Sequence, residues 1–192
     1  MPKKLKVLFA GDVGTGKTTA INSISDIPTV YTDVRASDIE DIGKTHTTVA
    51  FDYGEIHLAY LNNRLRLYGL PGQVRFSFIW DMLSDGVIGI VLLANNHRDN
   101  ALSETEQFLQ AFLPILQKEQ VAMVLGLTHS DVRAQYKSKD YWRILQKFRI
   151  NAPILSIDAR EKNDVLLLLE ALFSQIEATH RQTMHESGNS CT

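Results

Sequence analysis

Short apolar runs alternate with amphipathic stretches along most of the chain. Six runs have the length and residue types of β-strands, and they span residues 6–10, 49–58, 64–68, 87–93, 121–127 and 153–157. Between them, apolar residues recur at helical spacing over residues 17–25, 75–84, 103–116, 141–148 and 165–176. The alternation predicts an α/β fold with a six-stranded, mostly parallel sheet, helices on both faces and one hairpin formed by the second and third runs.

Two polar stretches interrupt this pattern. Residues 26–48 are rich in Thr and Asp and show no sustained period. We expect a loop there, and a loop of that length inside a compact domain is usually functional. The chain turns polar again near residue 180, which predicts one domain over residues 1–179 and a disordered tail over residues 180–192.

The composition is that of an ordinary globular protein. Hydrophobic residues make up 44% of the 192 residues and charged residues 22%, with a formal net charge of −2. This balance gives no general attraction to nucleic acid or anionic membranes, so we expect no polymeric nucleic acid partner. The single cysteine, Cys191, excludes a disulfide framework and favours the reducing cytoplasm. No apolar run approaches the ~20 residues of a membrane span, and signal and lipidation motifs are absent, so we expect no intrinsic membrane anchor.

Residues 11–18 fit the phosphate-loop pattern G-x-x-x-x-G-K-[ST], with a predicted strand before them and a predicted helix after them. Backbone N–H groups of such a turn and the helix dipole converge on phosphate oxygens. We expect Lys17 to reach the β- and γ-phosphates and the Thr18 hydroxyl to bind Mg²⁺. The nucleotide-binding candidates here are Gly11, Asp12, Val13, Gly14, Thr15, Gly16, Lys17, Thr18 and Thr19.

The other informative stretches also follow predicted strands. They are residues 69–73, 128–131 and 158–160. In a mostly parallel sheet the carboxyl ends of the strands meet at one edge, where ligands bind. The sequence therefore predicts that these stretches and the phosphate loop form one site.

Taken together, these elements resemble the small GTPase superfamily over about residues 5–178. The run Thr-Val-Ala-Phe-Asp-Tyr-Gly at 48–54 is similar to a Rab-type switch I. The resemblance implies that Thr48, or failing that Thr47, completes Mg²⁺ coordination, while we interpret Asp52 as an ordinary strand residue. Gly72 and Gln73 resemble the switch II pair, in which the glycine N–H senses the γ-phosphate and the glutamine orients the attacking water.

The run Tyr-Gly-Leu-Pro-Gly-Gln at 68–73 is closer to a bacterial and archaeal branch of that superfamily, which includes the MglA-type proteins. This resemblance implies GTPase-activating and exchange proteins as partners, together with a roadblock-type partner. Switch II usually begins with an aspartate that holds the Mg²⁺ hydration shell, whereas this chain has Gly69. Mg²⁺ would then rely on Thr18, Thr48 and phosphate oxygens.

The base-binding elements are also recognisable by resemblance. Residues 128–131, Thr-His-Ser-Asp, resemble the guanine-binding Asn-Lys-x-Asp, and Asp131 would accept hydrogen bonds from guanine N1–H and N2–H₂. Thr128 would offer a hydroxyl in place of the asparagine amide, and His129 either lies over the base or is a surface residue. Residues 156–160 resemble the Ser-Ala-Lys element, which implies nucleotide contacts from Asp158, Ala159 and Arg160.

These observations predict a GTP/GDP molecular switch that hydrolyses GTP with Mg²⁺, with Lys17 and Gln73 as the catalytic residues. Hydrolysis should be slow without an activating partner, because Val13 and Gly69 depart from the usual pattern and no arginine finger is assigned. One alternative is a nucleotide-binding scaffold with little or no hydrolysis. A P-loop kinase of a small metabolite is less favoured, because the sequence shows no arginine-rich lid.

Overall fold

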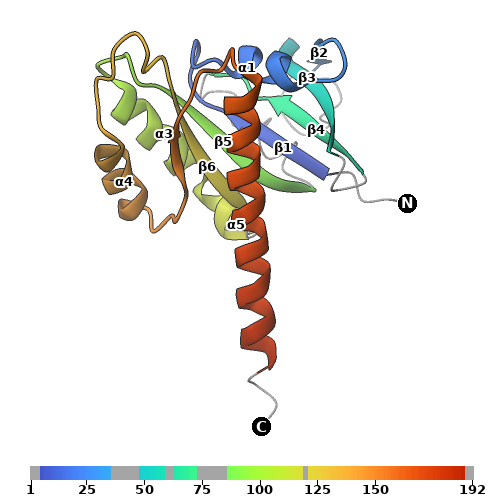
Figure 1. The fold of residues 1–192 in the computed structure, drawn as a ribbon, viewed down its shortest axis with the longest axis vertical. Coiled ribbons are helices and arrows are strands. Elements are labelled where there is room, and N and C mark those ends of the chain that lie inside the picture. Colours follow the sequence, from blue (N-terminus) through green and yellow to red (C-terminus); the bar gives the residue numbers. More distant parts are fainter. Residues whose placement is uncertain (1–4, 36–47, 59–62, 73–85, 119–120, 189–192) are drawn as a thin grey trace.

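A seven-stranded sheet forms the centre of the fold, in the order β2-β3-β4-β1-β5-β6-β7 (Figure 1). The computed structural model describes residues 5–35, 48–58, 63–72, 86–118 and 121–188. The strands are β1 (Leu5–Ala10), β2 (Val30–Arg35), β3 (Thr48–Leu58), β4 (Asn63–Gly69), β5 (Val87–Asn95), β6 (Ala122–Thr128) and β7 (Ile154–Ser156). Pairing is parallel from β4 through β1, β5 and β6 to β7, and antiparallel from β2 through β3 to β4.

The predicted α/β class and mostly parallel sheet are confirmed. All six predicted strands are present, and the predicted hairpin is the antiparallel pair β3–β4. The seventh strand, β2, lies inside the stretch that we predicted to be a loop, so that prediction was wrong for residues 30–35. Among the described strands, β2 lies at the edge of the sheet and pairs with β3 alone. An edge strand is less buried than a central one, so its sequence need not be a continuous apolar run.

Helices cover both faces of the sheet, as predicted. They are α1 (Lys17–Ile24), α3 (Ala101–Lys118), α4 (Ser138–Lys147) and α5 (Lys162–Gly188). β1 shows how the faces divide, because its side chains alternate between them. Leu8 is buried in the core beneath α3 and α4, whereas Val7 and Phe9 are buried in the core beneath α1 and α5. The loop between β1 and α1 follows directly from the carboxyl end of this central strand.

Helix α5 is longer than the sequence pattern indicated. We predicted a disordered tail from residue 180, but the helix continues to Gly188 and projects beyond the sheet (Figure 1). Polar residues such as Glu, Arg and Gln are good helix formers, so loss of the apolar stripe did not mark the end of the helix. The predicted helix over residues 75–84 lies outside the described residues. Within the described part of the chain, no helix is both long and apolar enough to cross a membrane.

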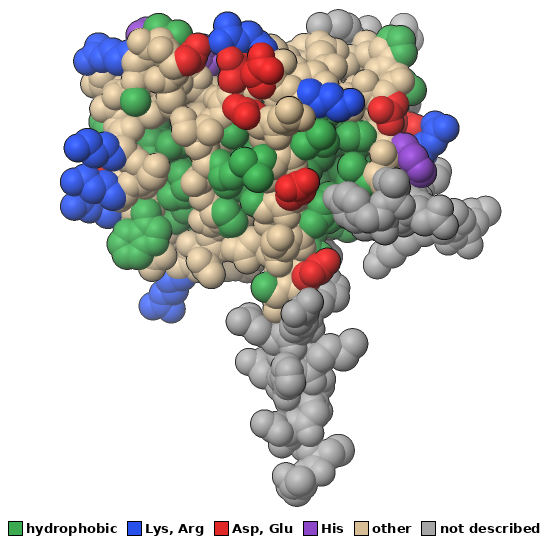
Figure 2. All heavy atoms as spheres, viewed as in Figure 1, with side chains coloured by type: hydrophobic (Ala, Val, Ile, Leu, Met, Phe, Trp, Pro, Cys, Tyr) green, Lys and Arg blue, Asp and Glu red, His purple; other side chains and the backbone are tan. Residues whose placement is uncertain are grey.

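Charge on the surface is mixed. Figure 2 shows basic side chains in separate groups near the rim of one face, with acidic side chains beside some of them and hydrophobic side chains between. This face therefore presents no single sign of charge among the described residues.

Candidate nucleotide-binding site

The phosphate loop joins β1 to α1 and depends on its glycines. Gly11 has a φ of +136°, and a Cβ added there would lie 2.2 Å from the carbonyl oxygen of Leu93 in β5. Gly16 has a φ of 92° and is the N-cap residue of α1. Residues with a Cβ rarely adopt such angles, and the first position also leaves no space for one. The loop can therefore pass close to β5 and present its backbone toward the start of α1.

The N-terminus of α1 has the features of an anion-binding site. Gly16 offers no side-chain cap, and the first turn contains no acidic residue. Lys17 begins the helix and is only 8% exposed. Its Nζ donates to the carbonyl oxygens of Gly11, at 2.9 Å, and Asp12, at 2.8 Å. The helix dipole and this ammonium group together create a positive cradle for phosphate.

Burial changes the acidity of Lys17. Desolvation lowers its pKa to about 8, while the carboxylates of Asp52 and Asp12 act in the opposite direction and Arg98 lowers it further. The ammonium form dominates at neutral pH but is lost at a lower pH than for a lysine in water. A bound phosphate would favour the charged form.

Arg98, in the turn after β5, contacts the phosphate loop through its side chain. Its guanidinium donates to the carbonyl oxygen of Val13 at 2.7 Å and lies 3.2 Å from a carboxylate oxygen of Asp12. Glu104 of α3 holds the same guanidinium at 3.4 Å. Sequence reasoning missed Arg98, because no motif marks it and only the fold brings it to a loop 85 residues away.

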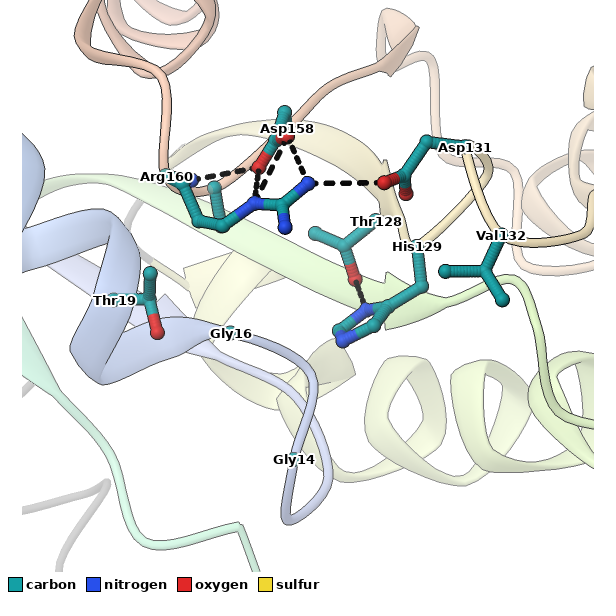
Figure 3. Close-up of a pocket in the computed structure, with 10 residues that line it drawn as sticks. Gly14, Gly16, Thr19, Thr128, His129, Asp131, Val132, Asp158 and Arg160 are labelled. Atoms are coloured by element: carbon teal, nitrogen blue, oxygen red, sulfur yellow. Dashed lines mark hydrogen bonds and ion pairs between the residues drawn. The ribbon is translucent and has the colours of Figure 1, made fainter.

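A pocket of about 370 Å³ opens beside the phosphate loop (Figure 3). Its lining comes from three segments that the sequence singled out and one further residue, Val132. The lining residues are Gly14, Gly16, Thr19, Thr128, His129, Asp131, Val132, Asp158, Ala159 and Arg160. The volume lies within the range of small-molecule sites. The fold thus places the predicted base-binding residues next to the predicted phosphate cradle.

Arg160 spans the rim of this pocket (Figure 3). Its guanidinium donates to Asp131 Oδ2 at 2.9 Å and, through Nε, to Asp158 Oδ1 at 2.8 Å. The hydrogen bonds that Asp158 accepts from the Arg160 side chain and backbone N–H lower the pKa of Asp158 to about 2. Asp158 therefore stays ionised and holds Arg160, whereas the Asp131 carboxylate, 54% exposed, has accepting positions left for a ligand.

Thr128 and His129 lie next to the phosphate loop, and the Thr128 hydroxyl points elsewhere than the motif suggested. The Thr128 hydroxyl is 3.0 Å from the carbonyl oxygen of Thr15 and 3.2 Å from that of Ala94. It is therefore directed at the backbone and does not offer a hydrogen bond to a base. His129 lines the pocket, has a φ of 58°, and places Nδ1 2.9 Å from the Thr128 hydroxyl.

The predicted switch II glycine lies against the phosphate loop. A Cβ on Gly72 would lie 2.5 Å from the backbone nitrogen of Val13. Thr48 is the first residue of β3 and pairs through its backbone with Arg35. Gln73 and Thr47 lie outside the described residues, so the structure places neither.

Residues 29–188 match the model of a family described as conserved hypothetical ATP binding protein. The chain belongs to this ATP-binding family. No curated protein matches the chain as a relative. The matched range begins after the phosphate loop and includes both predicted base-binding segments. Membership in the ATP-binding family, with the phosphate loop, supports a P-loop nucleotide-binding protein, but it does not single out the small GTPases that the sequence resembles.

One further residue of this ATP-binding family member reaches the site. Asp52 of β3 is 8% exposed, and the Thr18 hydroxyl donates to its Oδ2 at 2.6 Å. We had interpreted Asp52 as an ordinary strand residue. The sequence did indicate that a carboxylate was missing, because Gly69 stands where switch II usually has an aspartate. Only the strand register, which places Asp52 directly opposite Gly69, shows which residue lies in that place.

Proposed function

We propose that the protein binds GTP and GDP with Mg²⁺ and acts as a molecular switch that hydrolyses GTP slowly. The observation that carries this proposal is the position of Asp131, whose carboxylate lines the pocket beside the phosphate loop. A nucleotide base would enter that pocket when the phosphates occupy the loop. The proposal therefore concerns which base the pocket prefers and what happens to the γ-phosphate.

Hydrogen-bond chemistry favours guanine. A carboxylate only accepts hydrogen bonds, and the edge of guanine presents two neighbouring donors, N1–H and N2–H₂. Adenine presents an unprotonated N1 at the same place, whose lone pair would face the carboxylate of Asp131. Ala159, which also lines the pocket, would offer its backbone N–H to guanine O6. The family description names ATP, so base preference is the first property to measure.

Hydrolysis would depend on groups around the phosphates. Lys17 would neutralise charge on the β- and γ-phosphates, and the Thr18 hydroxyl, beside a buried carboxylate, fits a hard cation such as Mg²⁺. When bound, Mg²⁺ would spread the charge that develops on the transferred phosphoryl group. We propose that Thr48 completes its coordination and that Gln73 orients the attacking water.

The switch itself would operate through the two segments that resemble switch I and switch II, at residues 48–54 and 68–73. Gly72 lies against the phosphate loop, so its backbone N–H is suited to report whether a γ-phosphate is present. We propose that activating and exchange proteins, and a roadblock-type partner, recognise that difference. This part of the proposal rests on the resemblance to small GTPases.

Competition binding tests the proposed base preference. Purified protein would be loaded with a fluorescent GDP analogue in Mg²⁺ and displaced with GTP, GDP, ATP or ADP. We expect guanine nucleotides to displace the probe at concentrations at least about tenfold lower, because guanine would donate two hydrogen bonds to the carboxylate of Asp131, whereas adenine would turn the lone pair of N1 toward it. Equal or better displacement by ATP would overturn the proposal in favour of the nucleotide that the family description names.

A nucleotide-binding scaffold with little hydrolysis is the second candidate. It is favoured by Val13, whose side chain is 55% exposed next to Gly72 and would crowd a neighbouring catalytic glutamine. Both candidates predict the same base preference, so binding does not separate them. Single-turnover phosphate release from bound GTP does.

A further inference from the structure

We propose that Asp52 supplies, from β3, the Mg²⁺-binding carboxylate that this chain lacks at Gly69 on β4. The inference rests on the proposed function, because it concerns the cation that would accompany the nucleotide. It assigns to Asp52 a role in holding Thr18 and the waters around the cation, without direct contact to the reacting phosphate.

Strand register brings the two residues together. Asp52 and Gly69 are direct partners in the antiparallel pair β3–β4. A Cβ added to Gly69 would lie 2.8 Å from Asp52 Oδ2 and 2.9 Å from Asp52 Cβ. The Asp52 side chain thus lies over the glycine, in the space that a side chain at residue 69 would need. A carboxylate can occupy this space from one strand or the other, but not from both.

The contact with Thr18 has the direction that cation binding requires. The hydroxyl donates its one hydrogen to Asp52 Oδ2 at 2.6 Å, which leaves the lone pairs of Thr18 Oγ1 for a cation. A carboxylate has about four accepting positions. Those that Thr18 does not occupy would hold water molecules of the Mg²⁺ shell, which the ion gives up reluctantly.

Burial makes a purely structural role for this carboxylate costly. Asp52 is 8% exposed, and an ionised carboxylate removed from water requires compensation by charge or hydrogen bonds. The nearby Lys17 ammonium, which is also 8% exposed, is directed at the carbonyl oxygens of the phosphate loop. A divalent cation at Thr18 would supply further positive charge next to Asp52.

Nucleotide dissociation tests the role of Asp52. The rate of loss of a fluorescent GDP analogue would be measured in Mg²⁺ and in EDTA for the parent, Asp52→Asn and Asp52→Ala. Loss of a residue that orients metal ligands typically weakens metal affinity by about 10–100-fold. We therefore expect the Mg²⁺ concentration that gives half-maximal slowing to rise by about that factor in the Asp52 variants, with rates in EDTA close to the parent's. Glu55→Gln, which also removes a carboxylate from β3, is the matched control and should keep the parent's Mg²⁺ response.

A double variant tests whether the carboxylate can act from the other strand. Asp52→Gly combined with Gly69→Asp frees the space above residue 69 and restores the charge there. We expect it to recover much of the Mg²⁺ response that Asp52→Gly alone loses, which a general loss of stability would not do. An unchanged half-maximal Mg²⁺ concentration in both Asp52→Asn and Asp52→Ala overturns the inference. Failure of the parent itself to bind guanine nucleotide in EDTA and in Mg²⁺ overturns the proposed function, and this inference with it.

Discussion

The hydroxyl oxygen of Thr128, the last residue of β6, lies 3.0 Å from the carbonyl oxygen of Thr15 in the phosphate loop. This buried hydrogen bond joins residues 113 positions apart in the sequence. It therefore connects the residue that begins the far side of the pocket directly to the loop that would hold the phosphates. A ligand that occupies both the pocket and the phosphate loop would therefore bind two segments that this hydrogen bond already holds together.

We predict that Thr128→Val lowers the free energy of unfolding by about 1–3 kcal/mol, because buried carbonyl oxygens lose their donor while side-chain shape is conserved. Urea denaturation monitored by circular dichroism measures the change. Thr105→Val is the matched control, since Thr105 is also buried but donates to the Ala101 carbonyl inside helix α3. A loss at Thr128 no larger than the loss at Thr105 would show that the bond to the loop contributes little.

Asp131→Asn should shift base preference from guanine toward xanthine. The asparagine amide can donate to the carbonyl oxygen that replaces the N2 amine, whereas the carboxylate cannot. Competition between GTP and XTP for the same fluorescent nucleotide measures the ratio. Asp158→Asn is the matched control, because Asp158 lines the same pocket but both of its carboxylate oxygens already accept hydrogen bonds from Arg160. Equal GTP-to-XTP ratios in the parent and Asp131→Asn would remove the assignment of Asp131 to the base.

The sequence could predict the position of the site because that position follows from topology. Continuous apolar runs marked the central strands β5 and β6, and the carboxyl ends of parallel strands necessarily meet at one edge. The phosphate loop, Asp131 and Arg160 were therefore expected to lie close together, and they do. Each of these elements can be recognised from a few consecutive residues of the sequence.

Contacts between distant strands and turns were harder to predict. Asp52 reaches Thr18 only because β3 pairs with β4 in one register, and a shift by one residue would turn its side chain to the other face. Arg98 reaches Val13 only through the path of the turn after β5. The edge strand β2 was missed because an edge strand has no continuous apolar run to mark it.

Nucleotide affinity should fall as the pH rises through about 8, the pKa that burial gives Lys17 in the free protein. Phosphate oxygens favour the ammonium form, so the pKa of Lys17 rises on binding and a proton is taken up above this pH. Below it Lys17 is already charged and affinity is constant, whereas above it affinity should fall by up to about tenfold per pH unit.

Titrations with GDP between about pH 7 and 9 measure how steeply nucleotide affinity falls with pH. Lys17→Arg is the control, because a guanidinium stays charged throughout and should give a flatter profile. A parent profile as flat as that of Lys17→Arg would contradict the role of Lys17.

Intrinsic GTP hydrolysis should be slow and should respond to residue 13. A Cβ added to Gly72 would lie 2.5 Å from the backbone nitrogen of Val13, so the phosphate loop and the predicted switch II segment are in close contact at Gly72. The Val13 side chain, 55% exposed beside that contact, would occupy space that Gln73 needs to align a water. Small GTPases without an arginine finger turn over slowly, and a finger supplied by a partner accelerates them by about 10³–10⁵.

Single-turnover phosphate release for the parent, Val13→Gly and Gln73→Leu separates the contributions to that rate. We expect Val13→Gly to be faster than the parent, because glycine removes the crowding, and Gln73→Leu to be slower, because leucine cannot orient water. GDP affinity, measured in parallel, should stay within a few-fold in all three, so that a change in rate reflects the chemical step. If Gln73→Leu matches the parent, another group positions the water. If the parent already releases phosphate as fast as a partner-stimulated GTPase, neither Val13 nor the missing arginine limits hydrolysis, and a group from within the chain must supply the positive charge.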